Sequence, residues 1–226
     1  MKIVIVSDAW LPQTNGVVRT LSALRQELLG FGHDVVMITP ENFTTIPCPT
    51  YGEIRLALVP GFEVDRILTA YRPDAIHVAT EGPLGYAARR FCRSRKLPFT
   101  TSFHTKFPDY IKARFGVPMR WTYALLRRFH AAASATMVAT DSVRRELEGH
   151  GFGRLKRWTR GVDMISFRPM APGPYSAGTA SGSSSGIRRR VNGSKPRCSI
   201  QWMISSRPSR CSTSAEQLST QSPSLQ

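Results

Sequence analysis

Short apolar runs alternate with longer amphipathic segments along residues 1 to about 165, and this alternation limits the possible folds more than any other feature. The apolar runs predict strands at residues 2–7, 34–39, 53–59, 74–79, 97–103, 135–140 and 154–158. The first run is rich in Ile and Val without polar alternation, which is typical of a strand covered on both faces. Strands that alternate with helices need crossover connections. We therefore predict an α/β fold with a doubly wound, mostly parallel sheet over residues 1–170.

The helices between these strands are indicated by the spacing of their apolar residues. The first is marked by Val17, Leu21, Leu24 and Leu28, which recur at helical spacing. Glycines at positions 30 and 32 lie where helices commonly end. Further helices are predicted over residues 85–96, 117–133 and 141–150.

The composition changes after residue 170. Residues 171–226 hold 15 serines in 56 positions, with six Leu, Ile or Val and no Phe. That is below the roughly 20% of Leu, Ile, Val and Phe expected of a chain that buries a core. We interpret residues 171–226 as a low-complexity, disordered tail. A nucleic-acid-binding arm is the alternative, but no aromatic residue is interleaved with its arginines at 188–190.

Charge and cysteine content set the class of partner and the compartment. The net charge is +16, so a non-catalytic basic module that binds membrane or nucleic acid remains an alternative, although charge alone is a weak guide. The four cysteines form no Cys-x-x-Cys pair, which disfavours a zinc site and fits a reducing compartment. No run approaches the roughly 18 apolar residues of a membrane span. We expect a cytoplasmic protein, with a peripheral position on the inner face of the membrane as an option.

Ligands of open parallel sheets bind beyond the carboxyl ends of the strands, and two loops there offer an anion site and a sugar contact. Asn15 and Gly16 follow the first predicted strand. Gly16 lets a ligand approach the backbone, and the amides of the next helix favour an anion; an ordinary turn glycine is the alternative. Glu81 follows the strand at 74–79. Its carboxylate suits sugar hydroxyls, or it caps the following helix.

Two further loops carry polar side chains after predicted strands. His104 and Lys106 follow the strand at 97–103. The imidazole can donate or accept a hydrogen bond near neutral pH, and the ammonium suits a phosphate or carboxylate. A lone histidine after a strand is, however, more often structural. Arg160 opens the segment 160–163 after the last strand, where an ordinary loop that leaves the domain is the alternative.

Taken together and in this order, these motifs resemble one family. The motifs are NGV at 15–17, EGPLG at 81–85, SFHTKFP at 102–108, and RGVD at 160–163 followed by Phe167. They resemble the family-four retaining glycosyltransferases of GT-B fold, in particular the GDP-mannose-dependent alpha-mannosyltransferases and the sulfoquinovosyl-diacylglycerol synthases. The resemblance covers nearly all of residues 1–170 and none of the tail.

The resemblance implies a role for each matched position. Two α/β domains would face each other across a cleft, with the acceptor held chiefly by the first and the nucleotide-sugar by the second. His104 matches the catalytic histidine that contacts the transferred sugar, and Glu81 and Lys106 lie in loops that shape the acceptor side. The donor side would include Gly16, whose matched glycine lies near the diphosphate, with Asn15 beside it, and Arg160 at the crossing into the second domain. Transfer to a lipid or sugar acceptor would need no metal or other cofactor, and no nucleic acid.

One departure from the family pattern affects activity. The family's second domain supplies an acidic pair, Glu-x7-Glu, but no Asp or Glu lies between Asp163 and Glu216. The 56-residue tail is also too short for an α/β domain. Stabilising the charge of the departing diphosphate is usually the largest catalytic contribution. We therefore expect a truncated, inactive form. A frameshift would produce such a tail, and the nucleotide sequence beyond codon 175 would show it.

Residues 112–130 combine basic and aromatic side chains and are a candidate for contact with an anionic membrane. The basic members are Lys112, Arg114, Arg120, Arg127 and Arg128. Cationic side chains attract anionic headgroups, and an aromatic neighbour such as Trp121 can lie at the interface. The alternative is that Leu125, Leu126 and Phe129 pack on the sheet and leave the arginines solvated.

Overall fold

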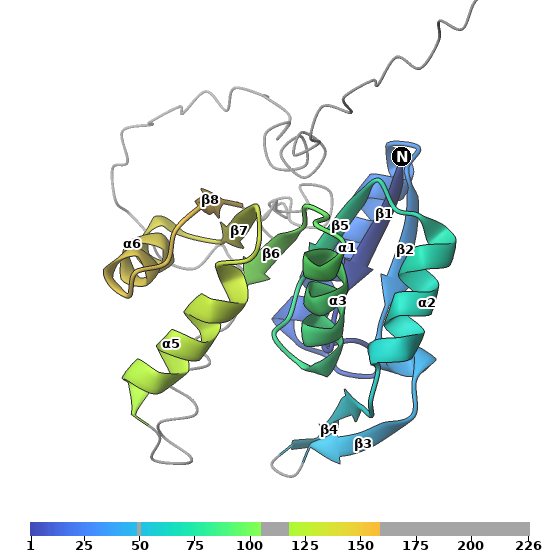
Figure 1. The fold of residues 1–226 in the computed structure, drawn as a ribbon, viewed down its shortest axis with the longest axis horizontal. Coiled ribbons are helices and arrows are strands. Elements are labelled where there is room, and N and C mark those ends of the chain that lie inside the picture. Colours follow the sequence, from blue (N-terminus) through green and yellow to red (C-terminus); the bar gives the residue numbers. More distant parts are fainter. Residues whose placement is uncertain (49–50, 105–117, 159–226) are drawn as a thin grey trace, which may run out of the picture.

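The computed structural model describes residues 1–48, 51–104 and 118–158, which form a six-stranded parallel sheet flanked by helices (Figure 1). The strands of this sheet are β1 (Lys2–Val6), β2 (Asp34–Ile38), β5 (Ala75–Val78), β6 (Thr100–Phe103), β7 (Ala135–Val138) and β8 (Leu155–Arg157). Their spatial order is β2-β1-β5-β6-β7-β8. β2 therefore lies on one side of β1, and β5 to β8 follow on the other side. This arrangement confirms the predicted doubly wound α/β fold.

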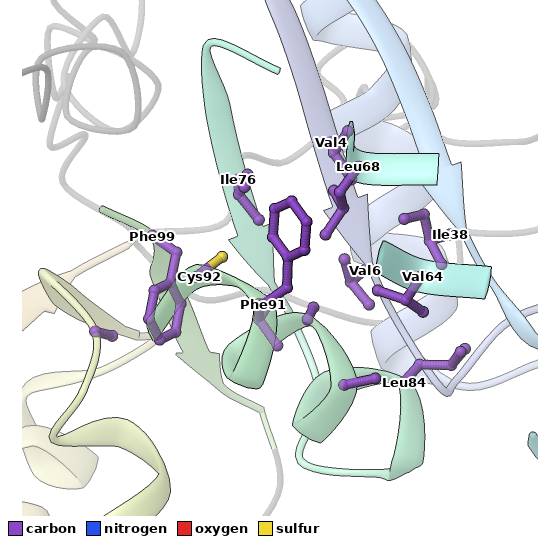
Figure 2. Close-up of a cluster of buried hydrophobic side chains, with 14 of the residues drawn as sticks. Val4, Val6, Ile38, Val64, Leu68, Ile76, Leu84, Phe91, Cys92 and Phe99 are labelled. Atoms are coloured by element: carbon purple, nitrogen blue, oxygen red, sulfur yellow. The ribbon is translucent and has the colours of Figure 1, made fainter. Parts of the chain in front are cut away.

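The two faces of β1 pack against different helices because its side chains alternate in direction. Ile3 and Ile5 are buried in one cluster with Leu21 and Leu28 of helix α1 (Gly16–Gly30). The other face of the sheet carries α2 (Gly61–Tyr71), α3 (Pro83–Ser94), α5 (Met119–His130) and α6 (Asp141–Gly149). Figure 2 shows this second face, where Val4 and Val6 of β1 meet Val64 and Leu68 of α2 and Phe91 of α3. Each fully buried side chain of this size contributes about 1.5–3 kcal/mol.

A β-hairpin projects from the sheet between β2 and α2. It consists of β3 (Thr45–Cys48) and β4 (Tyr51–Ala57), which pair antiparallel in a separate two-stranded sheet. The strand predicted at residues 53–59 therefore exists, but it lies outside the main sheet. The connection between the two strands is too short for the crossover that parallel pairing needs, so only antiparallel pairing is open to it. A short 3₁₀ helix, η1 (Pro40–Asn42), joins β2 to β3.

The C-terminus of α1 confirms one of the two glycines expected there. Gly32 has a φ of 77°, a left-handed conformation that glycine adopts without steric cost. Its N–H donates to the carbonyl of Leu29, and the N–H of His33 donates to the carbonyl of Leu28, as in a Schellman-type ending. Gly30 is instead the last residue of the helix.

Two arginines from outside α5 hold the end of that helix. Arg89 of α3 donates to the carbonyls of Arg128 and Phe129 at 2.8 and 2.9 Å, and Arg154 donates to the carbonyl of Ala131 at 2.8 Å. Terminal carbonyls lack intrahelical partners, and cations there also oppose the helix dipole. These bonds fix the end of α5 next to the sheet. Within the described ranges, no helix is both long and apolar enough to cross a membrane.

Candidate active site

The carboxyl ends of β1, β5 and β6 meet at one edge of the sheet, because the three strands are parallel neighbours. The chain leaves β1 toward β2 and returns on the other side of β1 as β5. This is the topological switch point of the fold, where open α/β sheets bind ligands. Asn15 and Gly16 follow β1, Glu81 follows β5 and His104 follows β6. The predicted site residues that the structure describes therefore follow three adjacent strands.

The carboxylate of Asp8, in the loop after β1, caps the first turn of α3. Its Oδ1 accepts from the N–H of Leu84 at 2.9 Å, and its Oδ2 accepts from the N–H of Gly85 at 3.3 Å. Thr80 donates its hydroxyl to Oδ2 at 2.8 Å and accepts from the N–H of Asp8 at 2.7 Å. A carboxylate at a helix N-terminus satisfies free amides and opposes the helix dipole. Asp8 therefore ties the loop after β1 to the loop after β5.

Burial and hydrogen bonding act on Asp8 in opposite directions. Burial raises the pKa of the Asp8 carboxyl above its ordinary value, whereas the bonds from Leu84, Thr80 and Gly85 lower that pKa. Burial is the larger effect, and the nearby Glu81 adds to it. Burying this carboxylate therefore costs free energy, and the hydrogen bonds from Leu84, Thr80 and Gly85 offset that cost only if the donors lie close to it.

Two glycines of the EGPLG motif make this close fit possible. A Cβ at Gly82 would lie 2.4 Å from the carboxyl carbon of Asp8, and a Cβ at Gly85 would lie 2.0 Å from the carbonyl oxygen of Thr80. No real side chain tolerates such contacts, and the Thr80 oxygen belongs to the backbone and cannot swing aside. The glycines of the motif therefore serve the packing of the loop after β5 against Asp8.

Glu81 contacts a histidine from another element. Its Oε1 lies 3.0 Å from Nε2 of His130, near the end of α5. The His130 side chain is buried, whereas the Glu81 side chain is 23% exposed. The helix cap that the sequence allowed for Glu81 comes from Asp8 instead. The buried His130 thus holds the Glu81 carboxylate, which stays accessible at the edge of the sheet.

A line of buried hydroxyl groups continues behind His130. Its Nδ1 lies 2.9 Å from Oγ1 of Thr101 in β6, and that oxygen lies 3.0 Å from Oγ1 of Thr136 in β7. Both threonines are buried. Buried polar groups that are fully hydrogen-bonded rigidify their surroundings, so Glu81 is supported through to the interior of the sheet.

His104 follows β6 directly and is held by the strand that precedes it. Its Nε2 lies 2.7 Å from Oγ of Ser102, and that oxygen also lies 3.2 Å from Nε2 of His77 in β5. His77 is fully buried, and its Nδ1 lies 2.9 Å from Oγ1 of Thr100. Burial, with a smaller effect of the neighbouring His104, lowers the pKa of His77 to about 3. His77 is therefore neutral under physiological conditions.

Trp158, which follows β8, packs its indole against both of these histidines. Its ring centroid lies 5.9 Å from that of His77 and 5.9 Å from that of His104, edge-on in both cases. The backbone N–H of Trp158 donates to the carbonyl of Val138 at 2.7 Å, so the indole is held by the sheet. The indole thus lies against both histidines that flank Ser102.

Asn15 caps helix α1. Its Oδ1 accepts from the N–H groups of Val17 and Val18, both at 3.0 Å, and its Nδ2 donates to Gln13. This side chain therefore already uses two of the amides that the sequence suggested for an anion. Gly16 is the first residue of the helix.

Two of the six predicted site residues, Lys106 and Arg160, lie outside the described residues. The same holds for the predicted tail and for residues 112–117 of the basic segment. Among the described residues, no three His, Cys, Asp or Glu side chains are grouped to hold a metal ion.

Sequence reasoning missed the groups that position the site. Asp8 stands directly after a strand without polar alternation, and that placement was the available signal. His77 and Ser102 lie within predicted strands, where polar side chains on a covered face indicate buried partners. His130 lies at the end of a predicted helix, 49 positions from Glu81, and only the packing of α5 brings the two together.

The parallel doubly wound sheet defines an α/β protein, with polar side chains gathered at the carboxyl edge of the strands. Residues 14–164 match the model of Glycosyltransferase Family 4. The chain belongs to this family.

The curated relatives that are similar to this chain include three from different groups of organisms. It is 28% identical over 190 residues to the GDP-mannose-dependent alpha-mannosyltransferase of Mycobacterium tuberculosis, which covers 76% of this chain and 50% of the relative. It is 27% identical to the sulfoquinovosyl transferase SQD2 of Arabidopsis thaliana, over 61% of this chain and 30% of the relative. It is 30% identical to the alpha-monoglucosyldiacylglycerol synthase of Streptococcus pneumoniae, over 49% of this chain and 28% of the relative. The chain thus spans half or less of each relative.

Proposed function

We propose that this chain forms the acceptor side of a retaining, GT-B-fold glycosyltransferase that moves a sugar from a nucleotide-sugar to a lipid or sugar acceptor. The observation that carries the proposal is that His104 and Glu81 follow adjacent strands at the switch point, each held by a buried partner. Polar groups held in this way are preorganised, which is what transition-state stabilisation requires. The relatives support the substrate classes, since their names specify a GDP-mannose donor and glycolipid products.

On the acceptor side, His104 contacts the transferred sugar, and Glu81 accepts hydrogen bonds from hydroxyl groups of the acceptor. Glu81 suits this role because its carboxylate is partly exposed while His130 holds it from inside. Lys106 lies two positions after His104 in the sequence and supplies a cation. On the donor side, Gly16, Asn15 and Arg160 line the approach of the diphosphate. Asn15 acts there by ordering the first turn of α1, through its bonds to Val17 and Val18.

The polypeptide by itself is expected to transfer sugar at a vestigial rate or not at all. Residues 164–215 contain no Asp or Glu, so they hold no acidic pair for the sugar and ribose of a donor. The experiment that tests the proposal is a transfer assay with labelled GDP-mannose. It compares this chain with a fusion of residues 1–163 to the second half of the Mycobacterium tuberculosis relative.

A peripheral contact with anionic membrane is a second proposed property, on the evidence of α5. Its buried side chains include Tyr123, Leu126 and Phe129, whereas Trp121 and Leu125 are 64% and 56% exposed. The exposed pair lies one helical turn apart, and three arginines of α5 are also exposed on the helix. An apolar pair among cations suits the interface of an anionic bilayer. The corresponding location would be the cytoplasmic face of the membrane.

A further inference from the structure

His104 stands at one end of a line of four hydrogen-bonding side chains. From the interior outward, the line runs from Thr100 to His77, then to Ser102 and His104, with separations of 2.9, 3.2 and 2.7 Å. Thr100 and Ser102 are two residues apart in β6 and therefore share one face of the sheet. His77 lies opposite Thr100 in the parallel register between β5 and β6. The strands themselves therefore set this line.

If the Ser102 hydroxyl donates within this line, the hydrogens can point in two consistent directions; if it donates to the carbonyl of Ala79 instead, both histidines can donate to Ser102. His77 is neutral because burial lowers its pKa to about 3, so one of its ring nitrogens donates and the other accepts. In one direction, Thr100 donates to His77, His77 to Ser102 and Ser102 to His104. In the other direction, each of these bonds is reversed. The two directions place the hydrogen of a neutral His104 on different ring nitrogens.

The separations favour the first direction. Hydrogen bonds donated by hydroxyl groups are shorter, near 2.7–2.8 Å, than those donated by N–H groups, near 2.9–3.0 Å. The first direction makes the 2.7 Å bond between Ser102 and His104 the one donated by a hydroxyl, and the 3.2 Å bond the one donated by His77. The reverse direction exchanges these roles. The carbonyl of Ala79, a competing acceptor for the Ser102 hydroxyl, is farther away at 3.3 Å.

We infer that Ser102 is a positioning residue that donates its hydroxyl hydrogen to Nε2 of His104 and so holds the neutral imidazole as the Nδ1–H tautomer. His77 and Thr100 orient the Ser102 hydroxyl, and the indole of Trp158 lies against both histidines. The consequence for catalysis rests on the proposed function: His104 meets the transferred sugar as a hydrogen-bond donor at Nδ1, and it does not act as a base at Nε2. The hydrogen bond at one ring nitrogen sets what the other can do.

Nuclear magnetic resonance of the whole chain with ¹⁵N-labelled histidine tests this inference without any substrate. Five histidines are present, and the His104→Gln variant identifies the signals of His104 by their loss. At pH values where His104 is neutral, we expect Nδ1 to carry the hydrogen and Nε2 to resonate as an unprotonated acceptor. Neutral histidine in water prefers the opposite tautomer. A protonated Nε2, or an equal mixture of the two tautomers, would overturn the inference.

Variants of two hydroxyl groups on β6 separate the proposed role from a general effect on structure. Ser102→Ala is expected to move His104 toward the Nε2–H tautomer, and Ser102→Thr, which keeps a hydroxyl, to restore the Nδ1–H tautomer. The matched control is Thr101→Val, because Thr101 contacts His130 and not His104. It should change the signals of His130 and leave those of His104 in place. Because no transfer is measured, a negative result here would leave the proposed function standing.

Discussion

The Asp8 carboxylate accepts the backbone N–H of Leu84 at 2.9 Å, across 76 positions of sequence. This bond joins the loop after β1 to helix α3, and the loop between β5 and α3 carries Glu81. The geometry of the candidate site therefore depends on a residue that is not itself expected to touch substrate.

Replacing Asp8 by alanine is expected to lower the free energy of unfolding by about 1–3 kcal/mol, because three donors lose their acceptor. Urea unfolding followed by circular dichroism measures the change. Asp8→Asn keeps one acceptor oxygen and is expected to cost less. A wild-type stability for the alanine variant would show that the cap contributes nothing.

The wild type and Asp8→Asn should differ in how their free energy of unfolding depends on pH. Burial raises the pKa of Asp8 above its ordinary value of 3.8, so the folded state binds this proton more tightly than the unfolded state does. The contribution of Asp8 to stability therefore falls as pH rises from 3.8 through the raised value. The advantage of the wild type over Asp8→Asn should accordingly shrink over that range. An advantage that grows with pH would contradict the raised pKa.

A methyl group at Gly85 should be far more harmful than one at Gly30. The Cβ at Gly85 would lie 2.0 Å from the carbonyl oxygen of Thr80, whereas a Cβ at Gly30 would meet nothing within 4 Å. Gly85→Ala is expected to destabilise by roughly 1–3 kcal/mol or more through overpacking. Gly30→Ala, within helix α1, should be neutral or stabilise by up to about 1 kcal/mol. Thermal unfolding measures the stability of both variants. An equal change in stability for the two would contradict the described packing.

Glu81 and His130 should be energetically coupled. In a double-mutant cycle with Glu81→Ala and His130→Phe, which keeps a ring but removes both nitrogens, we expect a coupling of about 0.5–3 kcal/mol. The exposed pair of Glu63 and Arg66 in α2 serves as the control, with an expected coupling of at most about 0.5 kcal/mol. Additive effects at Glu81 and His130 would show that the two side chains do not hold each other.

The sequence predicted the parallel sheet well because β1 is a run of Ile and Val without polar alternation and β2 is largely apolar, which is typical of covered strands. It missed α2, in which Val64 and Leu68 are the buried residues. The signal was present, because Val64, Ile67, Leu68 and Tyr71 recur at helical spacing, and Ile67 and Tyr71 are partly buried against the same core. At the site, the loop positions of Glu81 and His104 followed from strand order. The partner of Glu81 could not be predicted, because His130 reaches Glu81 only through the packing of α5 on the sheet.

The exposed side chains of α5 should bind anionic vesicles. Co-sedimentation of the chain with anionic vesicles in low salt is expected to fall strongly for the combined change Trp121→Ser and Leu125→Ser. High salt should weaken binding, because charges are then screened. The matched control is Val59→Ser, since Val59 is 91% exposed but lies before α2. Equal binding to neutral and anionic vesicles, or binding that survives the changes in α5, would remove the proposed contact.

The most direct test of the account is sugar transfer from labelled GDP-mannose to a total bacterial lipid extract. It compares three proteins: the chain itself, the fusion of residues 1–163 to the second half of the Mycobacterium tuberculosis relative, and that fusion with His104→Ala. Circular dichroism first establishes that each is folded. We predict product from the fusion, none above background from the chain itself, and a loss on the order of 10²-fold or more with His104→Ala. Turnover by the chain itself at ordinary enzyme rates, on the order of 1 s⁻¹ or faster, a folded fusion without product, or a fusion indifferent to His104→Ala would contradict the account.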